Sequence, residues 1–111
     1  MLEAEQKGVK SARAGMTAKA LDDVCRDHIR EAGYDEEFGH STGHGLGIEV
    51  HEAPGISFRG EDVVLKENTV VTIEPGIYLP GRCGVRIEDD VVLTATGCRV
   101  LTSSPRELII L

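Results

Sequence analysis

Two β-rich segments flank one glycine-rich turn in the second half of the chain, and this pattern restricts the fold more than any other feature. Residues 69–78 and residues 85–93 are rich in Val, Ile and Thr, which are residue types that strands prefer. The turn between them, residues 79–84, contains one proline and two glycines, and both are typical of turns. The pattern predicts an antiparallel hairpin as the centre of the fold.

The predicted hairpin brings two carboxylates face to face. A hairpin symmetric about Gly81 puts Glu74 directly opposite Glu88. The alternative is a slipped register, in which both glutamates face the surface. Opposed side chains have Cβ atoms about 5 Å apart, and two like charges there are destabilising. A shared proton or a bound cation would offset the repulsion, and Arg86 lies on the same face as Glu88 and can contribute. Pro75 removes one ladder hydrogen bond, which predicts a bulge or an edge beside this pair.

Three of the four histidines fall within residues 39–52, among four glycines: His40, His44 and His51. Histidine is the commonest metal ligand, and glycine lets the backbone approach a ligand closely. The spacing is not a standard zinc pattern, so a connector with solvated histidines is the alternative on this segment alone. Combined with the two glutamates, the segment predicts nitrogen and oxygen ligands for Mn²⁺, Co²⁺, Zn²⁺ or Fe²⁺. The excess of carboxylates favours Mn²⁺.

Two helices are predicted before this segment. The first covers residues 2–14, with its apolar face on Leu2, Val9 and Ala12 and with Glu5 among the outward charges. The second covers residues 18–32, with Thr17 as its N-cap and Gly33 as its end. Its apolar stripe is formed by Leu21, Val24, Cys25 and Ile29. We interpret three aspartates of this helix as a solvated face: Asp22, Asp23 and Asp27. Residues 34–68 are predicted to be irregular, and long loops of this kind are usually functional.

Composition excludes several classes of function. The 111 residues are enough for one domain at most. The net charge of −7 argues against nucleic acid or an anionic membrane as a partner, because either would require a basic patch. The odd number of cysteines, three, without a CxxC motif is typical of a reducing cytosol and not of a disulfide framework. Without an apolar run of about 18 residues or a signal peptide, we expect a cytoplasmic location.

Three segments, in this order, resemble the pita-bread metallopeptidases: residues 42–52 (TGHGLGIEVHE), 73–78 (IEPGIY) and 84–89 (GVRIED). The similarity is to the branch of Xaa-Pro aminopeptidase (aminopeptidase P) and Xaa-Pro dipeptidase (prolidase), and it covers almost the whole chain. The resemblance implies an α+β fold in which two helices pack on an antiparallel curved sheet, forming half of a pita-bread (creatinase/aminopeptidase) domain. It also implies hydrolysis of the bond before proline in a peptide substrate, with two divalent metal ions per site.

The resemblance also implies a role for the polar residues of these segments. His44, Glu74 and Glu88 would be metal ligands, of which Glu88 would bridge both metals and Glu74 would also take the proton of the attacking water. His51 would stabilise the developing oxyanion or hold the substrate carbonyl. His40 would contact the substrate near its proline.

Part of the family's site is missing from the chain. Arg86 would orient the acidic ligands, but the family needs two further aspartate ligands on an upstream strand, and residues 1–39 offer none on a strand-like segment. Residues 1–111 therefore read as a single partial domain, the C-terminal half of a catalytic domain, with the upstream half absent. Three of five expected ligands are present, so we expect little activity from this chain alone. Its uncovered sheet edge and apolar helix face predict self-association, as a homodimer that replaces the missing half.

Two other functions stay open at the level of sequence. Methionine aminopeptidase shares the fold, although residues 76–78 and 85–88 favour the proline-specific branch. A relative without metals, acting as a binding module or as a creatinase-type hydrolase, is the other alternative. The presence of His44, Glu74 and Glu88 argues against it.

Overall fold

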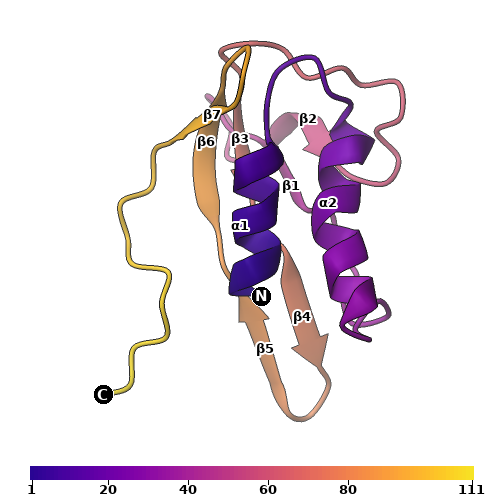
Figure 1. Cartoon of the computed structure of the whole chain (residues 1–111), viewed down its shortest axis with the longest axis vertical. Coiled ribbons are helices and arrows are strands. Elements are labelled where there is room, and N and C mark those ends of the chain that lie inside the picture. The colour runs from indigo at the N-terminus through magenta and orange to yellow at the C-terminus, as the bar shows by residue number, and fades with distance from the viewer.

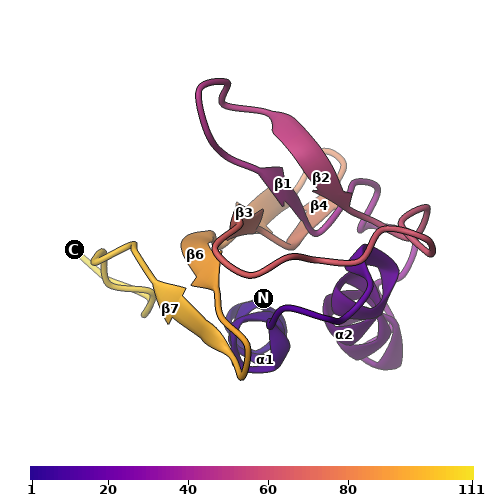
Figure 2. The same cartoon turned by 90° about the horizontal axis from the view of Figure 1, so that it is seen from above.

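The computed structural model describes all of residues 1–111, as two helices, a five-stranded sheet and a two-stranded hairpin. Every strand pair is antiparallel. Figure 2 shows both helices on the same side of the five-stranded sheet. This confirms the predicted α+β architecture of two helices packed on an antiparallel sheet. The elements are α1 (Leu2–Ser11), α2 (Ala18–Glu31), β1 (Gly43–Gly45), β2 (Glu52–Ile56), β3 (Val70–Ile73), β4 (Gly76–Leu79), β5 (Cys83–Arg86), β6 (Asp89–Leu93) and β7 (Cys98–Val100).

The caps of α2 agree with the sequence prediction, whereas α1 is shorter than expected. The Thr17 hydroxyl accepts a hydrogen bond from the amide of Ala20 at 3.1 Å, and Gly33 ends the helix with a φ of 84°. The prediction extended α1 to residue 14, but the helix ends at Ser11 and the next residue is extended. The amide of Ala14 donates instead to the carbonyl of Thr94. Bonding to the turn between β6 and β7 therefore replaces the last helical turn.

Two acidic residues that we assigned to solvated helix faces are completely buried. Glu5 on α1 and Asp22 on α2 are both 0% exposed, so the prediction was wrong for these two side chains. Both lie where a helix packs against the rest of the chain, and each has charged neighbours there. Asp23 and Asp27 remain at the surface, as predicted, in ion pairs with Lys19 and Arg30.

The predicted hairpin register is confirmed. Val70 pairs with Val92, and Ile73 pairs with Asp89; beyond a break, Gly76 pairs with Arg86. Each pair is equally distant from Gly81, which lies in the turn with a φ of 71°. The strands are not continuous, however, because the ladder is interrupted at residues 74–75 and 87–88, so β3 and β6 belong to the large sheet and β4 and β5 to the separate hairpin.

Residues 34–68 are less irregular than the sequence predicts. They contain β1 and β2, and β1 pairs with both β2 and β3, so the sheet order is β2-β1-β3-β6-β7. A strand of only three residues, Gly-His-Gly, has no recognisable periodicity, which explains why the sequence pattern missed it. The insertion of β1 beside β3 places the histidine segment next to Glu74.

The hydrophobic core lies between the helices and the large sheet. Val71 and Ile73 on β3, and Val91 and Leu93 on β6, are completely buried against α1 and α2. The alternation along β6 is that of a strand with one face on the core. The three cysteines are free thiols. Neither helix is long and apolar enough to cross a membrane.

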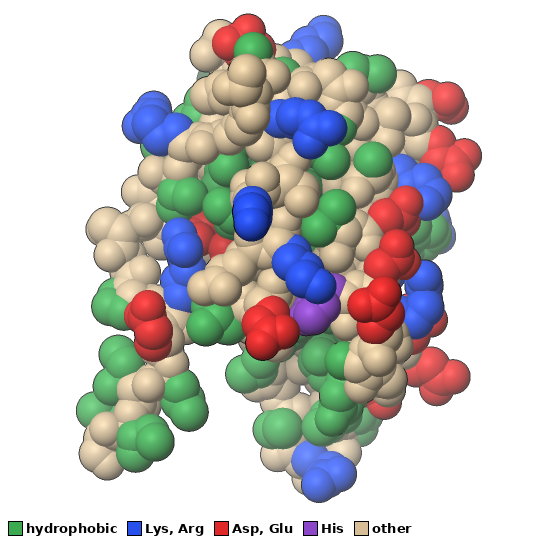
Figure 3. All heavy atoms as spheres, in the orientation of Figure 1, with side chains coloured by type: hydrophobic (Ala, Val, Ile, Leu, Met, Phe, Trp, Pro, Cys, Tyr) green, Lys and Arg blue, Asp and Glu red, His purple; other side chains and the backbone are tan.

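Large apolar side chains remain exposed at one end of the molecule. Figure 1 shows the C-terminal segment and the β4–β5 hairpin projecting in the same direction, and Figure 3 shows hydrophobic side chains gathered over both. Leu108, Ile110 and Leu111 are each more than 80% exposed, and Tyr78 and Val85 of the hairpin are 39% and 51% exposed. The last residues of the chain therefore carry the most exposed of these apolar side chains.

Candidate active site

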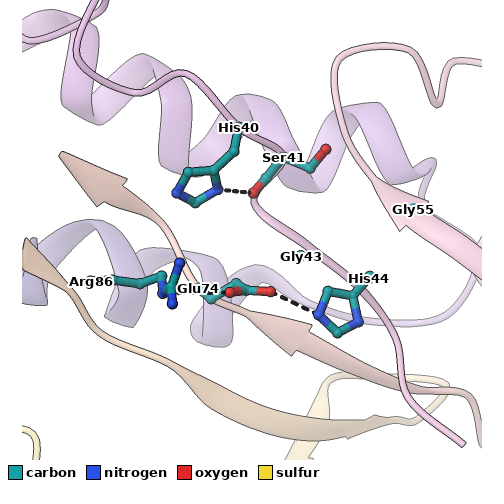
Figure 4. Close-up of a pocket in the computed structure, with 7 residues that line it drawn as sticks. All are labelled: His40, Ser41, Gly43, His44, Gly55, Glu74 and Arg86. Carbon is teal, nitrogen blue, oxygen red and sulfur yellow. Dashed lines mark hydrogen bonds and ion pairs between the residues drawn. The ribbon is translucent and has the colours of Figure 1, made fainter. Parts of the chain in front are cut away.

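A polar cavity of about 340 Å³ opens where the histidine segment crosses the break between β3 and β4 (Figure 4). None of its lining residues is hydrophobic; they are His40, Ser41, Gly43, His44, Gly55, Glu74 and Arg86. These residues come from the segment before β1, from β1 and β2, and from the two ends of the β4–β5 hairpin. The fold therefore collects residues that lie up to 46 positions apart in the sequence around one space.

Glycines on both sides of His44 permit β1 to lie this close to its neighbours. A Cβ atom at Gly43 would clash with the carbonyl of Thr72 on β3, and one at Gly45 would clash with the carbonyl of Ala53 on β2. Any larger residue would push β1 away from the strands on both sides. The sequence Gly-His-Gly thus allows β1 to fit between β2 and β3 while it carries the imidazole of His44.

His44 and Glu74 are in direct contact in the cavity. The Nε2 atom of His44 lies 2.9 Å from Oε1 of Glu74, and Nδ1 of His44 donates to the carbonyl of Gly45 at 2.9 Å. Because Nδ1 carries a proton, Nε2 of the neutral ring is a lone pair facing a carboxylate, which is favourable only with a proton or a cation between them. The Thr72 hydroxyl donates to the same Oε1 atom at 3.1 Å and accepts from the His44 amide at 3.0 Å.

A chain of hydrogen bonds connects Arg86 with His40 through Tyr78. Nδ1 of His40 donates to the carbonyl of Ser41 at 2.7 Å, so Nε2 accepts from the Tyr78 hydroxyl at 3.0 Å. That hydroxyl accepts in turn from Arg86 at 3.2 Å. The Nε atom of Arg86 also lies 3.7 Å from Oε2 of Glu74. In Figure 4 the Glu74 carboxylate lies between Arg86 and His44.

His51 and Glu88 lie at the edge of this group. The ring centroids of His51 and His44 are 4.3 Å apart, although His51 is on an exposed loop. Glu88 is also an exposed residue, yet partial burial of its carboxyl group, followed by the charge of Glu74, raises its pKa. The predicted proximity of the two glutamates therefore has an electrostatic effect. No three His, Cys, Asp or Glu side chains are grouped closely enough to hold a metal ion, so Glu88 does not complete a set with His44 and Glu74.

The contact between His44 and Glu74 fits part of a metal site. Two donors that bind one cation at about 2.1 Å and at right angles are about 3 Å apart, close to the 2.9 Å between Nε2 and Oε1. The tautomer of His44, with Nδ1 donating to a carbonyl, is the one that leaves Nε2 free to bind a metal. The chain thus presents two donors that fit a divalent cation.

The comparisons with known proteins agree with this geometry. The chain matches the metallopeptidase family M24 over residues 1–95. The chain belongs to metallopeptidase family M24.

Relatives of this M24 chain include enzymes of solved structure. It is 53% identical over 109 residues to a Xaa-Pro dipeptidase of Pyrococcus horikoshii, and the aligned region covers 98% of this chain and 31% of that relative. The structure of a Xaa-Pro dipeptidase from Bacillus anthracis superposes with a TM-score of 0.97 at 56% identity, over 99% of this chain and 31% of that one. An X-Pro aminopeptidase from Thermotoga maritima has a TM-score of 0.92 at 58% identity, over 96% and 30%. The chain therefore spans about a third of the length of these relatives.

Several residues that contact the candidate site were missed at the level of sequence. Thr72 and Tyr78 are two residues before and four residues after Glu74. Because side chains of a strand repeat every two residues, the sequence could have placed all three on one face. Asp22 occupies a position on the apolar stripe of α2, three residues before Cys25 and one after Leu21. A charged residue within an apolar stripe is itself a signal for a buried partner.

Proposed function

We propose that the protein carrying this chain is a divalent-metal-dependent peptidase that hydrolyses the peptide bond before proline. The supporting observation is the direct contact of His44 with Glu74 in a polar cavity, 2.9 Å between Nε2 and Oε1, in a member of metallopeptidase family M24. The substrate class comes from the relatives, whose names include both Xaa-Pro dipeptidase and X-Pro aminopeptidase. A proline-containing peptide is therefore the proposed substrate, either a dipeptide or a longer chain.

In this proposal His44 and Glu74 hold the metal centre where they already meet, and Glu88, which lies outside that pair in this structure, joins them when the centre is occupied. Two metal ions per site are expected, with Mn²⁺ favoured by a donor set of two carboxylates and one imidazole. When bound, divalent cations make water more acidic and stabilise negative charge on the substrate oxygen. Two further aspartate ligands are expected from outside residues 1–111, either from the same protein or from a second copy.

The other polar residues have roles in binding and proton transfer. Glu74 accepts the proton of the attacking water, because its carboxylate lines the cavity beside His44. His51, whose ring lies next to that of His44, stabilises the developing negative charge on the substrate carbonyl. His40 contacts the substrate near its proline, since its ring lines the same cavity. Arg86, 3.7 Å from Oε2 of Glu74, holds that carboxylate in orientation.

Hydrolysis of a short Xaa-Pro peptide in the presence of Mn²⁺ tests the proposal. We expect turnover by the full-length protein that carries this chain, and a loss of roughly 10²- to 10⁴-fold in kcat on Glu74→Gln, the range typical of a general base. Glu67→Gln is the matched control, because Glu67 is an exposed glutamate in the loop before β3. Hydrolysis of methionyl peptides without proline, or turnover that needs no metal, would contradict the proposal.

A further inference from the structure

A buried ion pair on α2 contacts the histidine segment. The carboxylate of Asp22 is 0% exposed and accepts two hydrogen bonds from the guanidinium group of Arg26, at 2.7 Å from Nε and 3.1 Å from Nη2. A two-point contact of this kind fixes the plane of the guanidinium group. Burial of an ion pair is costly in desolvation, and an apolar pair would often be at least as stable. Stability of α2 alone therefore does not account for the pair.

The rest of the Arg26 guanidinium holds the backbone that leads to the site. Nη1 donates to the carbonyl of Phe38 at 3.0 Å, and Nη2 donates to the carbonyl of His40 at 2.9 Å. The guanidinium also lies over the ring of Phe38, 4.2 Å from its centroid. One side chain of α2 thus holds two carbonyl groups, one of them at His40 itself.

Asp22 continues this contact as far as Glu74. Its Oδ1 atom accepts from the amide of Thr42 at 3.0 Å, and the carbonyl of Thr42 accepts from the amide of Glu74 at 2.7 Å. Thr42 is completely buried and lies two residues from both His40 and His44. The backbone at Thr42 therefore connects α2 with Glu74 and sets the spacing between the histidines and the glutamate.

The structure assigns Asp22 and Arg26 as positioning residues for the candidate active site. Together they hold residues 38–42 so that the rings of His40 and His44 face the cavity that contains Glu74. Neither side chain is among the residues lining the cavity; they act through peptide groups. Only the metal-binding measurement in the test of this assignment rests on the proposed function. The orientation of the histidine rings can be measured without metal.

The chain offers a matched control on the same helix. Lys19 and Asp23 form an ion pair with the same four-residue spacing, 2.6 Å from Nζ to Oδ2. Its two side chains are partly exposed, and their one side-chain hydrogen bond is to each other. If Asp22 and Arg26 only stabilised α2, then Asp22→Asn would differ from Asp23→Asn in the free energy of unfolding and not in the position of the histidine rings. Leu21→Ala, which removes a buried side chain of the same helix, supplies a variant of lower stability with the ion pair intact.

The experiment compares Asp22→Asn and Arg26→Lys with Asp23→Asn and Leu21→Ala in the full-length protein. Imidazole resonances of His40 and His44 are recorded by NMR without metal, and Mn²⁺ affinity is measured by calorimetry. We expect Asp22→Asn and Arg26→Lys to shift both imidazoles and to weaken Mn²⁺ binding 10- to 100-fold, as partners of ligand residues do. Asp23→Asn and Leu21→Ala should leave both readouts at the wild-type values. Arg26→Lys keeps the charge opposite Asp22, so it tests the same contacts if Asp22→Asn does not fold.

Unshifted imidazoles in both Asp22→Asn and Arg26→Lys would overturn the assignment. So would Leu21→Ala weakening Mn²⁺ binding as much as Asp22→Asn does, because the effect would then follow stability and not position. Failure of the wild-type protein to bind Mn²⁺, and Co²⁺ or Zn²⁺ in its place, would instead contradict the proposed function. In that case the imidazole resonances still decide the role of Asp22 and Arg26.

Discussion

Glu5 on α1 is a carboxylic acid enclosed by protein, and its surroundings determine which protonation state the fold prefers. The residue is 0% exposed, and neither of its oxygen atoms has a hydrogen-bond partner of good geometry. Burial, followed by the adjacent carboxyl group of Asp89, raises the pKa of Glu5 to about 7, whereas the charge of Arg106 lowers it. Arg106 forms an ion pair with Asp89, and its charge only partly offsets the effect of burial and of Asp89 on the pKa of Glu5.

This environment predicts that Glu5→Gln removes part of the pH dependence of stability. The folded state keeps the Glu5 proton up to about pH 7, while the unfolded chain releases it near pH 4.5. The wild-type free energy of unfolding therefore falls as pH rises from 4.5 to 7, by on the order of 1 to 3 kcal/mol. We expect Glu5→Gln to be the more stable form at pH 8, measured by urea unfolding at pH 5 and pH 8. Glu31→Gln, at an exposed position at the end of α2, should behave as the wild type. An unchanged slope in Glu5→Gln would refute the interpretation.

At the scale of elements, β1 is the segment whose position the site depends on. It has three residues, it contributes His44, and it is held between β2 and β3. Its own sequence has little preference for a strand, since two of its three residues are glycine. Tertiary contacts therefore create this strand, and the close approach at Gly43 is the contact that sets its distance from β3.

Gly43→Ala is predicted to lower the stability of the fold, whereas Gly39→Ala is not. The new Cβ atom at position 43 would clash with the Thr72 carbonyl, whereas one at position 39 would meet no atom within 4 Å. Overpacking of this kind typically costs about 1 to 3 kcal/mol. Thermal unfolding of the two variants, which carry the same chemical change in the same segment, measures the difference. Equal melting temperatures would mean that β1 is not fixed by this approach.

The N-cap of α2 gives a second prediction at this scale. Thr17→Ala removes the hydroxyl that accepts from the Ala20 amide, which should reduce the free energy of unfolding by about 1 kcal/mol. Thr17→Ser keeps an equivalent oxygen atom and should retain most of the stability. Chemical denaturation of the two variants provides the measurement, and a loss of the same size in Thr17→Ser would assign the effect to the lost methyl group.

At the scale of the whole molecule, apolar surface is concentrated where the C-terminal segment and the β4–β5 hairpin project (Figure 3). Contiguous exposed apolar patches usually mark places where another protein surface binds. The patch includes Tyr78 of the hairpin, whose hydroxyl is hydrogen bonded to His40 in the candidate active site. A surface that covers the patch would therefore lie close to the site.

We expect residues 1–111, produced alone, to self-associate through this patch. Light scattering at micromolar concentration should give a mass of at least twice 12.0 kDa. The double variant Leu108→Lys/Ile110→Lys should shift the mass towards the monomer, because it places charges among the exposed apolar side chains. Glu107→Lys, which alters charge but no apolar residue of the same segment, is the control. A monomeric mass for the unaltered chain would contradict self-association.

The sequence by itself determined the elements whose signals are local. The cap at Thr17, the end of α2 at Gly33 and the hairpin register about Gly81 were all predictable, because each depends on residues within one turn or one pair of strands. The same register brought Glu74 and Glu88 into one region, and the resemblance of their segments led to the family.

Only the tertiary structure decided which polar groups are buried and where β1 lies. The carboxylates of Glu5 and Asp22 look like solvated charges in a helical pattern, yet each is enclosed because distant segments pack over it. The contact between His44 and Glu74 likewise depends on β1 being inserted between β2 and β3. The physical reason is the same in each case: burial and metal-ligand geometry arise from contacts between segments far apart in the chain, and these leave no periodic trace in the sequence around any one residue.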